Sequence, residues 1–278
     1  MRALVGIVVA SSVLAATPAV ALARKASDDK HHKLADKRGK KLTASRAPQG
    51  DSKSTKTRAA RITATRGRER IEPRELAHGQ SVGVPWSGRL QHASQLPSGD
   101  GYVIRHPSRA FGTETTVAMI ERAVGETIEA FPDQHALAIG DISTESGGRI
   151  SDHRSHQAGR DVDIGLFYSE QPQGYPESFV HATRDNLDCA ATLKLIQSFY
   201  ATRNDDGGVQ MIFLDYDVQG ILYNWAVDHG FSEDRLDRIF QYGHGRGGSD
   251  ALVRHWPNHD NHIHVRFKCP DADSSCHD

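Results

Sequence analysis

The 278-residue sequence predicts one α+β domain around a central antiparallel sheet, preceded by a disordered basic arm. Two observations support this division. All 19 aromatic residues lie at or after Trp86, and residues 24–74 hold 17 of the 34 Lys and Arg residues against only six acidic residues. A segment with strong charge of one sign and no aromatic residue cannot bury enough apolar surface to fold. This excludes a two-domain globular chain and leaves one folded domain of about 200 residues.

Residues 1–23 have the layout of a secretory signal peptide. A positive start and the apolar run 3–14 precede two small-x-small cleavage signals within 19–23. A membrane helix is the alternative, but Pro18 interrupts a stretch that is short for a span of about 20 residues. We therefore expect export to a periplasm or beyond, with no transmembrane anchor after cleavage.

Residues 24–77 are expected to form a disordered basic linker rich in Lys, Arg, Ser, Thr and Ala. It is either a solvated spacer or an electrostatic tether to a polyanion such as a cell-wall polymer, an anionic lipid or a nucleic acid. The lack of aromatic residues argues against a surface that stacks bases, so no specific nucleic-acid partner is expected. The folded domain is expected over residues 78–278.

Apolar periodicity predicts the elements of that domain. Helical spacing predicts helices over 117–131, 187–202 and 218–229. Pro132 ends the first of these helices, and Gly230 is a typical residue just past the end of the last. Short apolar or alternating runs predict strands over 136–142, 161–167, 209–214 and 262–267. Helices and strands are mixed without regular alternation, which favours an α+β domain.

The chain has 16 histidines, and four of them lie between residues 255 and 264. Alternation along 262–267 places His262, His264 and Arg266 on one strand face and the apolar residues on the other. Two imidazoles two residues apart on one face can point into a single site.

A second polar group lies in the glycine-rich stretch 147–163. The strand that begins at Asp161 aims Asp163 off its polar face, and His156 lies seven residues earlier on the loop that enters the strand. Gly159 would let this loop turn sharply and bring His156 back beside Asp163. Asp161 shares the strand face and is left as the rival of Asp163.

Two histidines and one aspartate are a ligand set suited to Zn2+, with a fourth position left for water. That open position distinguishes a catalytic zinc site from a closed structural one. Because a single histidine on a strand face is usually an ordinary surface or core residue, the prediction depends on the combination. His-x6-Asp and His-x-x-His-x-His occur together here in a chain expected to be exported.

Export also bears on the three cysteines. In an oxidising compartment we expect a small-loop disulfide between Cys269 and Cys276, which are seven residues apart. Cys189 lies in an apolar helical pattern and is expected to be a buried free thiol rather than a nucleophile.

At these residues the sequence resembles the penicillin-insensitive murein endopeptidases, within the wider group of lysostaphin-type peptidases, D-Ala-D-Ala metallopeptidases and the hedgehog fold. The main motifs are Ser155-His156-Gln157-x-Gly159-x-Asp161-Val162-Asp163-Ile164 and His259-x-x-His262-x-His264-Val265-Arg266. Further matches follow in order at 79–83, 109–112, 139–141, 147–149 and Cys269-Pro270 with Cys276. The resemblance covers about residues 78–276 and implies a hedgehog/D-Ala-D-Ala-peptidase-like fold.

The resemblance also implies a role for each residue. The zinc ligands would be His156, Asp163 and His264. His262 would be the general base or acid, and His259 would help to stabilise the bound water or the oxyanion.

The resemblance gives His153 a separate place. It corresponds to a further histidine with which some members of the family hold a second zinc. The Asp-x-x-His that completes that second site has no clear counterpart after residue 170, where Asp185 and Asp188 are the nearest carboxylates. One zinc is therefore expected, and the second is left open.

The expected function is an exported zinc endopeptidase that hydrolyses amide bonds in the cross-link peptides of peptidoglycan. An open zinc site lowers the pKa of a water to about 7 and polarises the scissile carbonyl, and His262 would move the proton. The alternatives are a D,D-carboxypeptidase or dipeptidase of the same group, and a catalytically silent peptidoglycan-binding module. The retained His262 favours an enzyme, because a structural zinc needs no free imidazole beside it.

Overall fold

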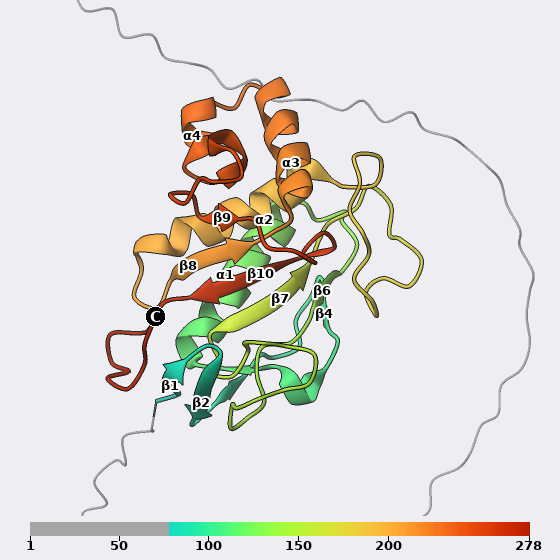
Figure 1. The fold of residues 1–278 in the computed structure, drawn as a ribbon. Helices are drawn as coiled ribbons and strands as arrows, with labels where there is room; N and C mark the ends of the chain where they lie inside the picture. Colours follow the sequence, from blue (N-terminus) through green and yellow to red (C-terminus); the bar gives the residue numbers. More distant parts are fainter. Residues whose placement is uncertain (1–77) are drawn as a thin grey trace, which may run out of the picture. The chain divides into compact units, whose positions relative to one another are not determined.

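The computed structural model of the protein describes residues 78–278 (Figure 1). The signal peptide expected at 1–23 and the linker expected at 24–77 lie outside the described residues, so both stay predictions. The described part is an α+β domain, as the sequence predicts. None of its helices is long and apolar enough to cross a membrane.

A six-stranded sheet forms the centre of the domain, in the order β4-β6-β7-β10-β8-β9. The strands are β4 (Tyr102–Ile104), β6 (Leu137–Ile139), β7 (Asp161–Gly165), β8 (Val209–Phe213), β9 (Val253–Arg254) and β10 (His262–Phe267). The four inner strands are antiparallel to their inner neighbours, and they are the four strands that the sequence predicts.

The two edge strands correct the expectation of a purely antiparallel sheet. β4 runs parallel to β6, and β9 runs parallel to β8. Neighbouring parallel strands need a long, usually helical crossover, and both connections here contain one. The sheet is therefore mixed. The hedgehog-like fold implied by the resemblance stays a prediction.

Four α-helices accompany the sheet. They are α1 (Glu114–Ala130), α2 (Cys189–Ala201), α3 (Tyr216–Asp228) and α4 (Glu233–Asp237), with 3-10 turns at Pro107–Arg109, Thr202–Asn204 and Gln241–His244. α1, α2 and α3 confirm the three helices predicted from periodicity. The side chains of Thr113, Asp188 and Asp215 each accept a backbone N–H in the first turn of their helix, which explains where these helices begin. α4 was not predicted.

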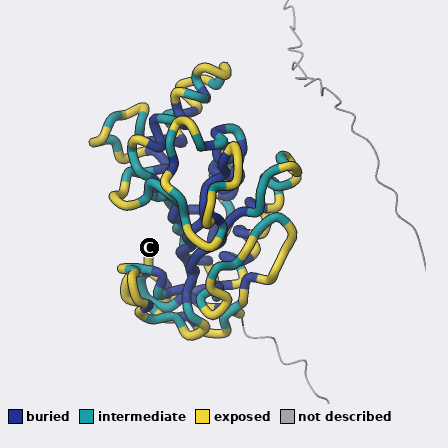
Figure 2. Tube along the Cα trace, turned by 90° about the vertical axis from the view of Figure 1, so that its right-hand side faces the viewer, coloured by how far each residue is buried: buried dark blue, intermediate teal, exposed yellow. Residues whose placement is uncertain are grey.

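Helices α1 and α2 pack together on one face of the sheet and close the core (Figure 1). The apolar face of β10 points toward them, and the ring of Phe267 lies 6.0 Å from that of Phe199 on α2. Val162 and Ile164 of β7 are fully buried in the same core, which runs through the centre of the domain (Figure 2). The polar residues of β7 and β10 therefore occupy the opposite face.

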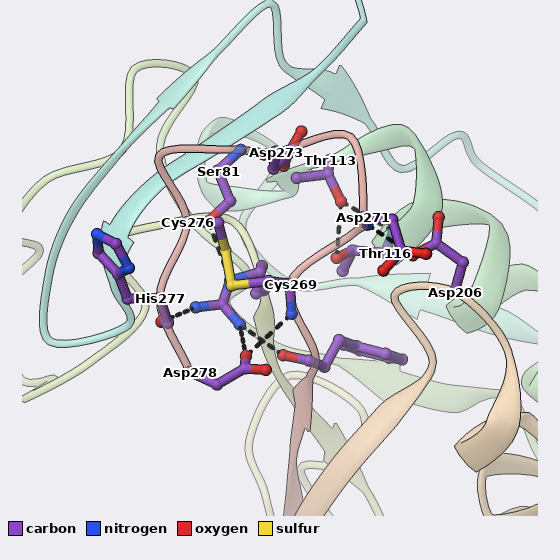
Figure 3. Close-up of a disulfide and its surroundings, with 12 residues drawn as sticks. Ser81, Thr113, Thr116, Asp206, Cys269, Asp271, Asp273, Cys276, His277 and Asp278 are labelled. Atoms are coloured by element: carbon purple, nitrogen blue, oxygen red, sulfur yellow. Dashed lines mark hydrogen bonds and ion pairs between the residues drawn. A yellow bond between two sulfur atoms is a disulfide. The ribbon is translucent and has the colours of Figure 1, made fainter.

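The C-terminal segment holds a hairpin of β1 (Gln80–Val84) and β2 (Ser87–Gln91) against the domain. Gly83 N donates to Ser275 O at 2.8 Å. Ser81 N donates to Asp273 Oδ2 at 2.8 Å, and both residues are labelled in Figure 3. A second small pair joins β3 (Ser94–Gln95) and β5 (Phe111–Gly112). The hairpin matters for the site because the turn at its end contacts the loop of His156, as described below.

The buried guanidinium of Arg160 ties this segment to the sheet. It donates to Phe267 O at 2.8 Å, to His277 O at 2.7 Å and to Asp278 Oδ1 at 2.8 Å. Its Nε donates to Ser81 Oγ at 3.0 Å. Four partners compensate the cost of burying this charge.

The disulfide expected from the sequence is present between Cys269 and Cys276 (Figure 3). Cys189 is a buried free thiol at the start of α2, as expected. Burial raises the pKa of Cys189 to about 11, so the thiol is protonated near neutral pH.

Peptide mapping and thiol labelling test these assignments. Under non-reducing conditions Cys269 and Cys276 should appear in one linked fragment. Cys189 should resist alkylation at pH 8 in the folded protein, because it is buried and its pKa of about 11 leaves little thiolate. In denaturant the same thiol should react at once, which is the control. A bridge between Cys189 and Cys269 would contradict the structure.

Candidate metal centre

Pairing of β7 with β10 brings the two predicted motifs together. The register sets His264 opposite Asp163 and Arg266 opposite Asp161. Opposed residues of an antiparallel pair project from the same face of the sheet. The two polar strand faces, predicted separately, therefore form one polar surface.

The loop before β7 returns His156 to this surface. Gly159 has a φ of +68°, and a Cβ there would lie 2.8 Å from the side chain of Leu90, so only glycine fits. His156 itself has a φ of +64°. Its backbone N–H donates to Asp161 Oδ2 at 3.2 Å, and its Nδ1 donates to Ile142 O at 3.1 Å. The Nδ1 bond fixes the ring so that Nε2 faces the surface.

One donor atom each from His156, Asp163 and His264 lies 3.1–3.3 Å from the other two. His156 Nε2 lies 3.3 Å from Asp163 Oδ1 and 3.3 Å from His264 Nδ1. His264 Nδ1 lies 3.1 Å from Asp163 Oδ1. Nitrogen and oxygen ligands about 2.0–2.1 Å from a tetrahedral ion lie about 3.3 Å apart. This donor set therefore fits a small tetrahedral cation such as Zn2+ in both chemistry and spacing.

The electrostatics of the three donors also call for a cation. Asp163 Oδ1 is buried and makes no hydrogen bond to any described residue. Although burial opposes ionisation, His156 and His264 hold the pKa of Asp163 well below its usual range. Burial disfavours the charged form of His264, but Asp161 and then Asp163 raise its pKa to about 9. In the absence of a metal, a proton thus supplies the positive charge that the site needs.

Asp161, the rival left open by the sequence, is engaged elsewhere. It accepts two hydrogen bonds from Arg266, from Nε at 2.7 Å and from Nη2 at 3.0 Å. Its Oδ1 also lies 3.4 Å from Nε2 of His264, on the side of the ring away from Asp163. A carboxylate in that position orients a metal-binding histidine instead of binding the metal itself.

His153 lies at the edge of the three donors. Ligand atoms of His153, His156 and Asp163 lie within 4.8 Å of one another, so this group could also hold a metal ion. His153 Nδ1 is 3.6 Å from Asp163 Oδ2, the oxygen that faces away from His264. This spacing is looser than that of His264, whose Nδ1 lies 3.1 Å from Asp163 Oδ1.

The other nitrogen of His153 leads to a residue that the sequence analysis did not assign. His153 Nε2 lies 3.0 Å from Asp141 Oδ2, and this hydrogen bond raises the pKa of His153. Asp141 also accepts hydrogen bonds from His106 and Arg109. Although burial opposes ionisation, these three donors hold the pKa of Asp141 well below its usual range. The only sequence signal for Asp141 is its place in the matched motif Ile139-Gly140-Asp141.

The two carboxylates considered as ligands of a second metal, Asp185 and Asp188, lie just before α2. Asp188 caps α2 by accepting from Ala191 N at 2.9 Å, and its other oxygen accepts from Gln134. Asp185 is exposed on the loop before α2. Asp188 is therefore engaged at the start of the helix.

His262 stands beside the donors with one nitrogen unoccupied. Its Nδ1 donates to Asn261 Oδ1 at 2.6 Å, and its Nε2 lies 3.7 Å from Asp163 Oδ1. Burial lowers the pKa of His262 to about 4. The ring is therefore neutral at pH 7 and presents the lone pair of Nε2 to the site.

A stack of planar groups fixes the orientation of His262. The ring of Phe179 stacks on it with centroids 4.8 Å apart, and the guanidinium of Arg105 lies over the ring of Phe179, 4.3 Å from its centroid. Phe179 and Asn261 belong to no motif in the sequence, and no local pattern pointed to either.

His259 lies next to both His262 and His264, with ring centroids 4.7 Å and 5.7 Å away. Its Nδ1 donates to Pro257 O at 2.9 Å. Burial lowers the pKa of His259 as well, so the neutral ring offers Nε2 as a hydrogen-bond acceptor.

Comparison with known proteins gives the family. A model of the family described as penicillin-insensitive murein endopeptidase matches residues 81–212. A protein of that name from Pectobacterium atrosepticum is 30% identical over 220 residues, which cover 73% of this chain and 71% of the relative. The chain belongs to this family.

Two further relatives carry the same name. The protein from Klebsiella pneumoniae is 29% identical over 209 residues, covering 72% of this chain and 70% of the relative. The protein from Haemophilus influenzae is 28% identical over 216 residues, covering 73% and 68%. The family resemblance stated from the motifs is thus confirmed.

The match to the murein endopeptidase family model ends before β10. It includes His153, His156 and Asp163, whereas His264 lies beyond residue 212. The contact of His264 with the other two donors therefore rests on the strand pairing in the structure.

Metal binding should release a proton. Below a pKa of about 9 the metal-free site holds a proton on His264, and the metal must displace it. Affinity for Zn2+ should therefore rise about tenfold per pH unit between pH 6 and 8 and level off near pH 9. Competition with a chromogenic chelator at several pH values measures this slope.

The slope has a matched control. His262→Ala keeps all three donors and should show the same slope, because His262 is already neutral above its pKa of about 4. An affinity independent of pH in the unmodified protein would contradict the proton on His264.

Proposed function

We propose that this protein is an exported, zinc-dependent murein endopeptidase that hydrolyses amide bonds in the cross-link peptides of peptidoglycan. The name shared by its relatives supports peptidoglycan as the substrate. The observation that supports catalysis is the convergence of three donors, 3.1–3.3 Å apart, beside the free Nε2 of a neutral His262. The signal peptide predicted at 1–23 supports a periplasmic or secreted location.

In this proposal His156, Asp163 and His264 hold the zinc ion. Zinc there would supply Lewis-acid polarisation of the scissile carbonyl and of an attacking water. The chain itself prepares the donors, because Ile142 O orients His156 and Asp161 faces the outer nitrogen of His264. His153 would support Asp163 from its Oδ2 side and is a ligand only if a second ion binds.

His262 acts as the general base in this mechanism. Its Nε2 can accept a proton from the attacking water, because Nδ1–H is held by Asn261 and the ring is neutral. The protonated ring can then deliver this proton to the leaving amine. Phe179 keeps the ring facing the donors during both steps.

His259 has a more defined role than the sequence suggested. With Nδ1–H donated to Pro257, a neutral ring can only accept a hydrogen bond at Nε2. It can therefore hold and orient the water, whereas donation to an oxyanion would require a protonated ring. Its lowered pKa favours the first of these roles.

Digestion of purified cross-linked peptidoglycan tests the proposal. Mass analysis of the fragments should reveal cross-linked peptides cut into their two halves. An exhaustive chelator should abolish the activity, Zn2+ should restore it, and penicillin should have no effect, because no serine is acylated. Activity that survives complete metal removal would contradict a metallopeptidase. Release of a single terminal alanine without loss of cross-links would indicate a carboxypeptidase instead.

Two histidine substitutions separate metal binding from proton transfer. His264→Ala leaves two protein ligands, so zinc content and activity should both be lost. His262→Ala keeps the three donors and should retain zinc, while its rate falls by about 10²–10⁴-fold through loss of the general base. Zinc per chain and turnover are measured on the same preparations.

The control for these variants is His229→Ala. His229 is an exposed residue at the end of α3 that stacks on Trp225, away from β7 and β10. It should keep both zinc and activity. If His262→Ala is metal-free and His264→Ala retains zinc, the two roles are exchanged.

A further inference from the structure

Two tryptophans are exposed on the side of the domain that carries the candidate metal centre. Trp86 is 54% exposed in the turn between β1 and β2, and Trp256 is 51% exposed in the segment after β9. Together with Val103 they are the exposed large apolar side chains of the described part. Single exposed apolar side chains are normal, whereas exposed apolar groups that form a contiguous surface indicate a binding site.

Ring contacts join the two tryptophans into one continuous surface, here called the aromatic strip. The guanidinium of Arg266 lies 5.7 Å from the ring of Trp86 and 5.3 Å from the ring of Phe213. The ring of Phe213 lies 5.5 Å from that of Trp256. The aromatic strip is therefore Trp86, Arg266, Phe213 and Trp256.

The aromatic strip borders the metal centre directly. Phe213 of β8 is opposite His264 in the sheet register, and the two rings are 5.2 Å apart. At the other end, Pro85 O accepts from Gln157 N at 3.0 Å, which fixes the turn of Trp86 to the loop of His156. A molecule lying on the strip is therefore next to the bond that the proposed enzyme cuts.

The backbone on both sides of the strip is held in place. The backbone N–H of His255, the residue before Trp256, donates to Gln241 Oε1 at 2.6 Å. The hydrogen bond from Gln157 N to Pro85 O holds the backbone next to Trp86. A backbone held in this way loses little further freedom when a ligand binds, which favours affinity.

The charge of the strip indicates the chemistry of its occupant. Arg266 donates hydrogen bonds from Nε and Nη2 to the carboxylate of Asp161, so the charge of Arg266 is already neutralised. The strip thus has flat apolar faces and little net charge to attract an anion. Nη1 of Arg266 makes no hydrogen bond to any described residue and can donate to a hydroxyl or acetamido oxygen.

We infer that the aromatic strip binds a sugar ring of the glycan strand adjacent to the peptide that is cut. This inference rests on the proposed function, because it assigns part of the same substrate. In peptidoglycan the broad apolar faces belong to the amino-sugar rings, whereas the peptides offer mainly carboxylates, amides and methyl groups. A pyranose face matches an indole, and its oxygens match the free Nη1 of Arg266.

The test compares two substrates that differ only in their sugars. One is a soluble cross-linked peptide dimer that carries its disaccharides, and the other is the same dimer after the sugars are removed. The unmodified full chain should have the higher kcat/KM on the sugar-bearing dimer. Trp86→Ala and Trp256→Ala should each lower the ratio of the two kcat/KM values about tenfold, which corresponds to about 1.4 kcal/mol.

Val103→Ala is the matched control, because Val103 is a 42% exposed apolar residue on edge strand β4, outside the strip. The ratio of the two kcat/KM values of the Val103→Ala variant should equal that of the unmodified protein. Zinc content and the thermal midpoint of each variant verify that it is folded. An unchanged ratio in both tryptophan variants would overturn the inference. An equal loss on both substrates would overturn it too, because the strip would then bind the peptide.

A binding measurement separates this inference from the proposed function. Peptide-free glycan strands are added to the unmodified chain, and quenching of tryptophan fluorescence is followed. Quenching should saturate, and the apparent affinity should be about tenfold weaker in each tryptophan variant. The fluorescence of Trp225 on α3, which lies outside the strip, should stay unquenched. If neither dimer is cleaved, the proposed function fails, and this titration alone decides whether the aromatic strip binds sugar. Absence of saturable quenching would then reject the sugar site.

Discussion

The pairing of β7 with β10 is the constraint on which the candidate site depends. Asp163 and His264 are opposed in this register, as are Asp161 and Arg266. A slip of one residue would turn every polar side chain of one strand into the core and its apolar residues outward. The buried Ile263 and Val265 prevent that slip, because they pack against the helical layer. The core thereby sets the geometry of the candidate metal donors.

The charges of this face follow from that arrangement. Two buried carboxylates lie side by side on β7, and the structure treats them differently. Arg266 neutralises Asp161 with two hydrogen bonds, whereas Asp163 keeps one oxygen without a hydrogen-bond donor among the described residues. The second carboxylate is thus left for a cation or for a proton on His264. The same neutralised Arg266 gives the aromatic strip its central planar group.

Loops from separate parts of the chain complete the site around the two strands. The loop before β7 supplies His156 and His153, and the segment before β10 supplies His259. Phe179 comes from the long connection between β7 and α2 and fixes the ring of His262. The C-terminal disulfide segment and Arg160 hold the β1–β2 hairpin, and with it Trp86. Each loop is anchored by backbone hydrogen bonds, so the surface around the donors is prepared before substrate arrives.

The sequence by itself determined the inner strands, the three long helices and which residues could meet, because alternation, helical spacing and capping are local properties of the chain. From position within a strand or turn it identified His156, His262 and His264 as candidate site residues, and it left Asp161 as the rival of Asp163. The tertiary structure decided what no local pattern encodes. The edge strands β4 and β9 are too short to show a period, and their parallel direction comes from the helical crossovers. That Asp163 rather than Asp161 is left without a hydrogen bond on one oxygen likewise depends on Arg266 of the neighbouring strand, because a carboxylate's partner is set by packing across the sheet.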